Sequence, residues 1–190
     1  MKGEQFLART QRLPAEILII EGWIGREGIE AAKVEFERGH YAYLVTGGGI
    51  SKNDWDNRQW NYAEEAGKLL VNLGVPADKV IEAPAQDVKT QRTFTTAIAV
   101  RRTLANRGLK IDKANIFTIG AHARRSRLVF AKVFPYPAQI GVVSFSLSSY
   151  RPEPWWKSSE RADTFIKETV GYLFELLLNS GRTTNEPVRP

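Results

Sequence analysis

Short apolar runs alternate with amphipathic stretches five times along the chain. The runs lie at 15–22, 41–49, 79–85, 115–120 and 138–147, and a stretch with helical spacing of apolar residues follows each of them. A continuous apolar run of this length is typical of a strand buried on both faces. Strand–helix alternation that is repeated in this way predicts a parallel sheet with helices on both sides.

The predicted fold is therefore a three-layer α/β/α sandwich around a parallel, five-stranded, Rossmann-like sheet with the strand order 3-2-1-4-5. Right-handed crossovers leave few other arrangements. In this order a crevice opens beyond the carboxyl ends of the first and fourth strands, where the chain reverses direction across the sheet. Helices are expected at 26–39, 60–73 and 90–107, from residue 122 onward, and at about 157–178.

One domain is expected at 15–178, between an N-terminal extension at 1–14 and a flexible tail at 179–190. The absence of Cys excludes disulfides, thiol catalysis and thiolate metal sites. No apolar run reaches the ~18 residues of a membrane span, and the first residues lack the apolar core of a signal peptide. A soluble, cytoplasmic protein is therefore expected.

Residues from three distant segments are expected to meet at the crevice. The first strand ends in Glu21, Gly22 and Trp23, and the fourth strand runs into His122. The strand beside the first one ends in Thr46, Gly47, Gly48 and Gly49. Because the carboxyl ends of parallel strands lie at one edge of a sheet, these side chains are predicted to surround a common ligand site.

The helix after the fourth strand carries Arg124, Arg125 and Arg127 in or beside its first turn. Cations at a helix N-terminus are disfavoured by a few tenths of a kcal/mol each. A bound anion between the guanidinium groups and the free backbone N–H groups would offset this cost. Arginines that simply point into water are the alternative. Other basic residues are scattered, so the net charge of +6 indicates no strong nucleic-acid surface.

His122 and Glu21 are the candidate catalytic residues. His122 could donate a hydrogen bond or transfer a proton, and Glu21 ends an otherwise apolar strand. A carboxylate in that position could act as a general base, accept a hydrogen bond from a ribose hydroxyl or orient an arginine. A purely structural ion pair with Arg124 or Arg125 is the alternative. The chain lacks GxSxG, so a hydrolase nucleophile elbow is not expected.

The glycine run at 47–49 either cradles a phosphate or adenosyl group with its N–H groups or forms a tight turn. It matches neither GxGxxG nor GxxxxGK[ST]. Asn53, Asp54 and Asp56 follow it in a loop, where a solvated surface is favoured over a cation site, and no metal is predicted. The loop tryptophans either stack on a planar ligand or anchor their loops to the domain; they are Trp55, Trp60, Trp155 and Trp156.

The chain resembles the bacterial YdcF/SanA/ElyC-like family, whose function is undefined, from about Ala15 to Leu178. Four stretches carry the resemblance: the strand that ends in Glu21-Gly22, LVTGGG, GVPADKVIEAPAQDVKTQRTFTTA and TIGAHARRSRLVF. On this alignment Thr93, His122 and Arg125 fall on a Thr, a His and an Arg of the family motifs. The chain departs from the pattern at Glu21, Arg92, Thr96 and Ser126.

The resemblance implies a Rossmann-like domain and makes S-adenosylmethionine a candidate ligand. Together with the arginines and the glycine run, it predicts a small anionic or nucleotide-like ligand at the carboxyl edge of the sheet. Arg124 and Arg125 would hold the anion, with Thr93 and the glycine run beside it. Relatives are linked to envelope and lipid-carrier metabolism, some of them at the membrane or outside the cytoplasm. Two alternatives are open: a hydrolase or transferase acting on a phosphorylated envelope precursor with His122 as acid–base, and a non-catalytic interaction module that presents Trp155 and Trp156. The sequence does not indicate the oligomeric state.

Overall fold

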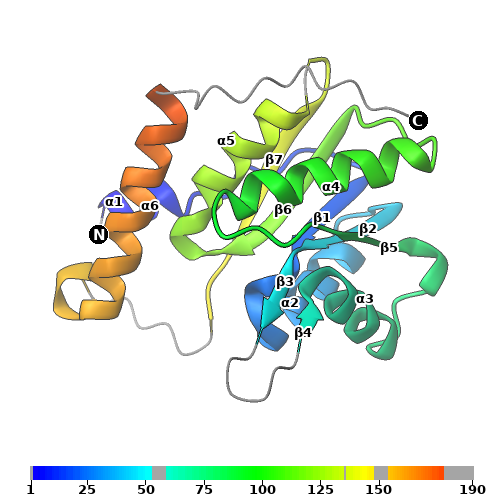
Figure 1. Ribbon diagram of the computed structural model, residues 1–190, viewed down its shortest axis with the longest axis horizontal. Coiled ribbons are helices and arrows are strands. Elements are labelled where there is room, and N and C mark those ends of the chain that lie inside the picture. The colour runs from blue at the N-terminus through cyan, green and yellow to red at the C-terminus, as the bar shows by residue number, and fades with distance from the viewer. Residues whose placement is uncertain (1, 53–58, 135, 148–153, 178–190) are drawn as a thin grey trace.

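The computed structural model describes residues 2–52, 59–134, 136–147 and 154–177 (Figure 1). Five parallel strands form the main sheet in the order β5-β2-β1-β6-β7. Their bounds are Ile17–Glu21 for β1, Tyr43–Gly48 for β2, Val80–Pro84 for β5, Lys113–Ile119 for β6 and Gln139–Phe145 for β7. The predicted fold class and the predicted order 3-2-1-4-5 are both confirmed. A short antiparallel pair, β3 (Ile50–Lys52) with β4 (Gln59–Asn61), was not predicted.

Two helices cover each face of the sheet (Figure 1). α2 (Gly25–Arg38) and α3 (Tyr62–Asn72) pack on one face, and α4 (Arg92–Asn106) and α5 (Ala123–Val133) pack on the other. Short 3-10 turns connect strands to helices at Gly22–Ile24 (η1), Ala77–Lys79 (η2) and Gly120–His122 (η3). The helices expected from apolar spacing are therefore present, with bounds that differ by only a few residues.

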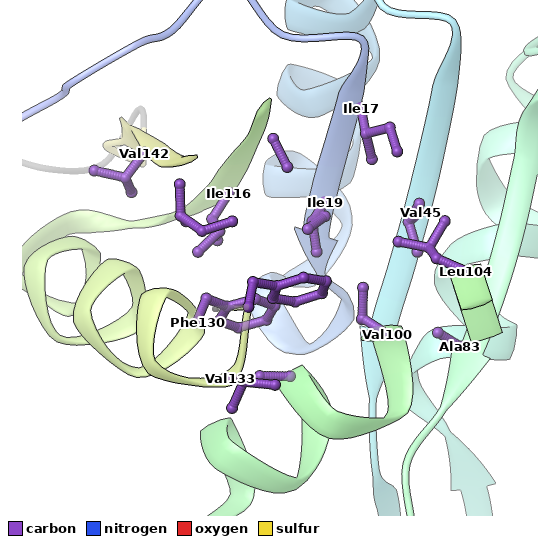
Figure 2. Close-up of a cluster of buried hydrophobic side chains, with 14 of the residues drawn as sticks. Ile17, Ile19, Val45, Ala83, Val100, Leu104, Ile116, Phe130, Val133 and Val142 are labelled. Atoms are coloured by element: carbon purple, nitrogen blue, oxygen red, sulfur yellow. The ribbon is translucent and has the colours of Figure 1, made fainter. Parts of the chain in front are cut away.

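The central strand β1 is buried along its whole length because its side chains alternate between two cores. Ile17 and Ile19 face the core beneath α4 and α5, whereas Leu18 and Ile20 face the core beneath α2 and α3. Figure 2 shows Phe130 of α5 in the first of these cores, close to Ile19. The apolar run therefore stops at the sheet edge, where Glu21 lies opposite Gly47 in the register.

Two further helices lie outside the three layers. α1 (Lys2–Leu7) and α6 (Ser159–Leu177) stand side by side at one end of the molecule and contact α5 and η3 (Figure 1). A 3-10 turn, η4 (Trp155–Lys157), leads into α6. The chain thus returns over the carboxyl end of β6, which is the predicted location of the ligand site.

The segment before β1 makes extensive contacts with the rest of the domain. Leu7 is buried, and Gln11 forms an antiparallel bridge with Val142 of β7. Arg12 binds the carboxylate of Glu35 through two hydrogen bonds of 2.7 Å. The residues that the sequence suggests as an extension, so far as they are described, are therefore tied to the sheet and to α2.

The candidate loop residues Asn53, Asp54, Trp55 and Asp56 and the tail at 179–190 lie outside the described residues. Among the helices that are described, none combines the length and the apolar character required to cross a bilayer.

Candidate functional site

The glycine run at the end of β2 provides close packing between the sheet and two helices. A Cβ atom on Gly47 would lie 2.8 Å from Cγ2 of Thr96 in α4, and one on Gly48 would lie 2.7 Å from Cβ of Tyr62 in α3. Both glycines are buried, and neither they nor Gly49 has a positive φ. The absence of side chains is thus explained by helix contacts at Gly47 and Gly48.

The start of α3 is joined to the ends of β1 and β2. A Cβ on Gly22 would lie 2.3 Å from the carbonyl oxygen of Tyr62, so only glycine fits this position. Thr46 Oγ1 donates a hydrogen bond of 2.8 Å to the carbonyl oxygen of Ala63. The Asn61 side chain accepts a bond from the Ala63 N–H and caps the helix. Gly22 and Thr46, both predicted to bind ligand, therefore position α3.

Glu21 is buried, with 1% of its surface exposed, and its carboxylate is held by side chains from two elements. Oε2 accepts hydrogen bonds from Thr118 Oγ1 of β6 at 2.5 Å and from Ser126 Oγ of α5 at 3.0 Å. It also lies 3.5 Å from Nε2 of His122. Burial by itself would raise the pKa of Glu21, but the nearby His122 and the donated hydrogen bonds lower it below its usual value. Its ionic partner is thus a histidine, and neither Arg124 nor Arg125.

His122 lies between two carboxylates. Its Nδ1 is 2.9 Å from Oε1 of Glu168 on α6, and its Nε2 faces Glu21. Burial opposes a positive charge on the ring, but the two carboxylates raise the pKa of His122 to about 9. At neutral pH the side chain is therefore an imidazolium. The ring of Trp23 meets it edge-on, with the ring centroids 5.0 Å apart.

Arg125 is paired with the same carboxylate. Its Nε donates to Glu168 Oε2 at 2.7 Å, and its Nη2 donates to Glu168 Oε1 at 3.1 Å. Burial would raise the pKa of Glu168, but His122 and Arg125 lower it to about 2. The negative charge expected beside Arg125 is therefore supplied by the protein itself, from a residue that the sequence analysis missed. Its place between Phe165 and Tyr172, on the inward face of α6, is the only signal that the sequence carried.

Arg124 also has partners within the protein. Its guanidinium carbon lies 3.7 Å from the ring centroid of Phe6 in α1, and its Nη1 is 3.4 Å from the hydroxyl of Tyr172 in α6. The contacts of Arg124 thus come from α1 and α6, and those of Arg125 come from α6 and from His122 of η3. Those of Gly47 and Gly48 come from α4 and α3. The structure does not join the two groups in the way that the sequence suggested.

Thr93 lies in the first turn of α4, half-buried, one turn before Thr96. Because Thr96 packs beside Gly47, Thr93 belongs to the same edge of the sheet. Arg127, the third arginine of the cluster, donates a hydrogen bond to the carbonyl oxygen of Ile140 and ties α5 to β7.

A groove of about 620 Å³ opens next to Trp23, between the start of α2 and α3. Three aromatic side chains line it, Trp23 from η1, Trp60 from β4 and Tyr62 from α3. Arg26 and Lys68 supply cations at its wall. They are paired at the surface with Glu30 at 2.8 Å and Glu65 at 2.9 Å respectively.

The described residues contain no cluster of His, Asp or Glu side chains arranged to hold a metal ion. The chain matches no model of a known protein family, and no curated protein shows significant similarity to it. The resemblance to the YdcF/SanA/ElyC-like family therefore stays a prediction from its motifs.

Proposed function

We propose that the protein binds a small anionic ligand with a planar ring, of the nucleotide or adenosyl type, at the carboxyl edge of the sheet. The observation that carries the proposal is the groove of about 620 Å³ that joins three aromatic rings with Arg26 and Lys68. Its volume is in the range of about 300–1,000 Å³ that small-molecule sites occupy.

The chemistry of the walls fits such a ligand. The exposed faces of Trp23 and Trp60 can stack on a flat ring. Within the part of the chain that the structure describes, Arg26 and Lys68 are held by exposed ion pairs, which contribute little, so both can turn toward a ligand's negative charge. Gly25, the first residue of α2, lies on the same wall, so the positive end of the helix dipole is close to the groove.

The buried charges beside the groove would act by holding Trp23. The His122 ring contacts Trp23, and Glu21 and Glu168 fix His122 from opposite sides. In this proposal Arg125 serves the same arrangement through Glu168. A cytoplasmic location, as the sequence predicts, would give the site access to nucleotides.

A second candidate function is hydrolysis or transfer on a phosphorylated envelope precursor, with His122 as the acid–base group. It is favoured by the carboxylate 2.9 Å from Nδ1, which orients the ring. Nε2 makes no hydrogen bond to the described residues, and the His122 ring lies edge-on to Trp23. With a pKa of about 9, His122 would begin the reaction as a proton donor.

Thermal unfolding in the presence of AMP, S-adenosylmethionine or a nucleotide sugar tests the first candidate. A bound compound at 100 times its dissociation constant adds about 2.7 kcal/mol of stability. Trp23→Ala should weaken binding by about tenfold or more, because one stacking face is lost. Trp156→Ala, which removes an exposed ring outside the groove, is the matched control and should bind normally. Binding that survives Trp23→Ala unchanged, or no response to any of the compounds, contradicts the proposal.

The second candidate is separated from the first by His122→Gln. If His122 only supports the groove, the variant changes affinity alone. If it donates a proton, phosphate release from a phosphorylated substrate falls by about 100-fold or more while binding persists.

A further inference from the structure

The side of helix α6 that faces the domain carries charged residues as well as aromatic ones, and much of the side that faces solvent is apolar. Its one fully buried residue is Glu175. Six apolar side chains on the other side are each 43–73% exposed, namely Ile166, Val170, Leu173, Phe174, Leu176 and Leu177. A surface helix of a monomeric domain normally has the opposite arrangement. Scattered exposed apolar residues need no explanation, but a continuous stripe marks an interaction surface.

Polar contacts on the inner side fix the rotation of α6. Glu168 binds Arg125 and His122, and Glu175 lies 3.2 Å from the ammonium group of Lys132. Turning the helix to bury its apolar stripe would separate these buried charges, which costs about 3–5 kcal/mol when one partner is lost. The stripe is therefore held outward by the fold.

The spacing of the stripe is that of a helix pair. Ile166, Val170, Leu173 and Leu177 follow one another at intervals of four, three and four residues. Apolar residues at this spacing form the seam along which two helices pack side by side.

We propose that α6 is a dimer interface and that its occupant is α6 of a second copy of this chain. The same stripe on two copies is self-complementary, as a two-fold interface requires. The charges beside the stripe balance, because Asp163 and Lys167 pair with each other at 2.7 Å. An anionic lipid surface would instead call for an excess of basic residues along the helix.

The area available agrees with this occupant. At roughly 100 Å² for each half-exposed apolar side chain, the stripe offers about 600 Å². The ring of Phe6 in α1, which contacts Tyr172 of α6 edge-on, is also about half exposed. The total approaches the ~800 Å² that each partner contributes to a stable interface.

Sedimentation velocity over a range of concentrations tests the proposal. The unmodified chain should sediment as a dimer, and the double variant Val170→Glu with Leu173→Glu should dissociate more than ~10-fold more readily, because its carboxylates would be buried without partners. Both side chains are exposed, so circular dichroism and thermal unfolding of the variant should match those of the unmodified chain. Thr164→Glu, at an exposed polar position of the same helix, is the control and should remain a dimer.

Cysteine cross-linking gives a second readout, because the chain has no Cys of its own. Val170→Cys or Leu173→Cys should form a disulfide-linked dimer under mild oxidation, and Thr164→Cys should not. A monomer at all concentrations overturns the proposal. So does a monomer that co-sediments with phosphatidylglycerol vesicles through the same stripe, which would make lipid the occupant.

Discussion

Arg125 and Glu168 lie 43 residues apart in the sequence and form a two-pronged ion pair, with N···O distances of 2.7 and 3.1 Å. The same carboxylate lies 2.9 Å from Nδ1 of His122. One carboxylate on α6 is therefore shared by two cations from the region where β6 meets α5, and Glu21 supplies the second negative charge beside His122. Nη2 of Arg125 and Nδ1 of His122 are themselves only 2.9 Å apart, so the shared carboxylate is required for both to remain in place.

Glu168→Gln should destabilise the protein by about 3–5 kcal/mol, because it leaves two neighbouring cations without their shared counterion. Urea unfolding at neutral pH measures the effect. Asp163→Asn is the control on the same helix, since it removes a carboxylate from an exposed ion pair and should change stability little. Equal losses in the two variants would contradict the role assigned to Glu168.

Stability should fall as the pH rises through about 9. The pKa of His122 is raised from 6.5 to about 9 in the folded chain, so the stabilisation is complete below about 6.5 and is lost as the imidazolium deprotonates. The loss is roughly 3 kcal/mol. Urea unfolding between about pH 6 and pH 10 should show it in the unmodified chain and in His40→Asn, which alters an exposed histidine. His122→Asn should lack it.

At low pH the dependence is reversed, and stability should fall as the pH falls. The pKa of Glu168 is lowered from 4.5 to about 2. Its contribution to stability is therefore complete above pH 4.5 and is lost as the pH falls through about 2. Glu21 also contributes stability that is lost on acidification, because its pKa is lowered too. Acid unfolding of Glu168→Gln should therefore be less steep than that of the unmodified chain, and an identical acid transition would show that Glu168 is not ionised in the folded protein.

Glu21→Gln should lower the pKa of His122 from about 9, because the imidazolium loses one of its two carboxylates. Titration of the His122 ring followed by NMR measures this directly. Glu16→Gln, which changes an exposed carboxylate just before β1, should leave the titration unchanged. A His122 pKa that does not respond to Glu21→Gln would assign the shift to Glu168 alone.

Gly48 and Gly49 of the glycine run, and Gly22 at the end of β1, should differ in their tolerance of alanine. Gly48→Ala places a Cβ 2.7 Å from Tyr62 Cβ and 3.1 Å from the backbone nitrogen of Ala63, so overpacking should cost about 1–3 kcal/mol. Gly22→Ala should cost at least as much, because its Cβ would meet a carbonyl oxygen at 2.3 Å. Gly49→Ala meets only one atom at 3.5 Å and should change stability by no more than about 0.5 kcal/mol. Similar losses at Gly48 and Gly49 would contradict this account.

The order of the main sheet was predictable because its strands are apolar on both faces and the crossovers have one hand. The strand order also predicts which residues are neighbours at the carboxyl ends of the strands. Glu21 does lie beside Gly47 and near His122. The small β3–β4 pair was not predictable, because Ile50–Lys52 and Gln59–Asn61 are short and lack a clear apolar pattern.

The candidate site was harder to derive, because its charges are satisfied from a distant helix. Arg125 carries a local signal for an anion, but nothing local tells a bound ligand from a carboxylate in the same chain. Glu168 is an ordinary residue within its own helix and gains its role only when α6 folds back over α5. The groove beside Trp23 depends in the same way on where α3 begins, which Gly22 and Thr46 determine through contacts with Tyr62 and Ala63.

The contact between residues 10–11 and β7 limits aggregation through the edge of the sheet. Gln11 exchanges two backbone hydrogen bonds with Val142, and the Thr10 hydroxyl accepts one from the N–H of Ser144. At the opposite margin of the sheet, Pro84 in β5 offers no N–H. An incoming strand would thus meet occupied backbone groups at Val142 and Ser144 of β7 and one missing donor in β5, which discourages pairing at either edge of the sheet. Contact between α6 helices does not depend on these edges.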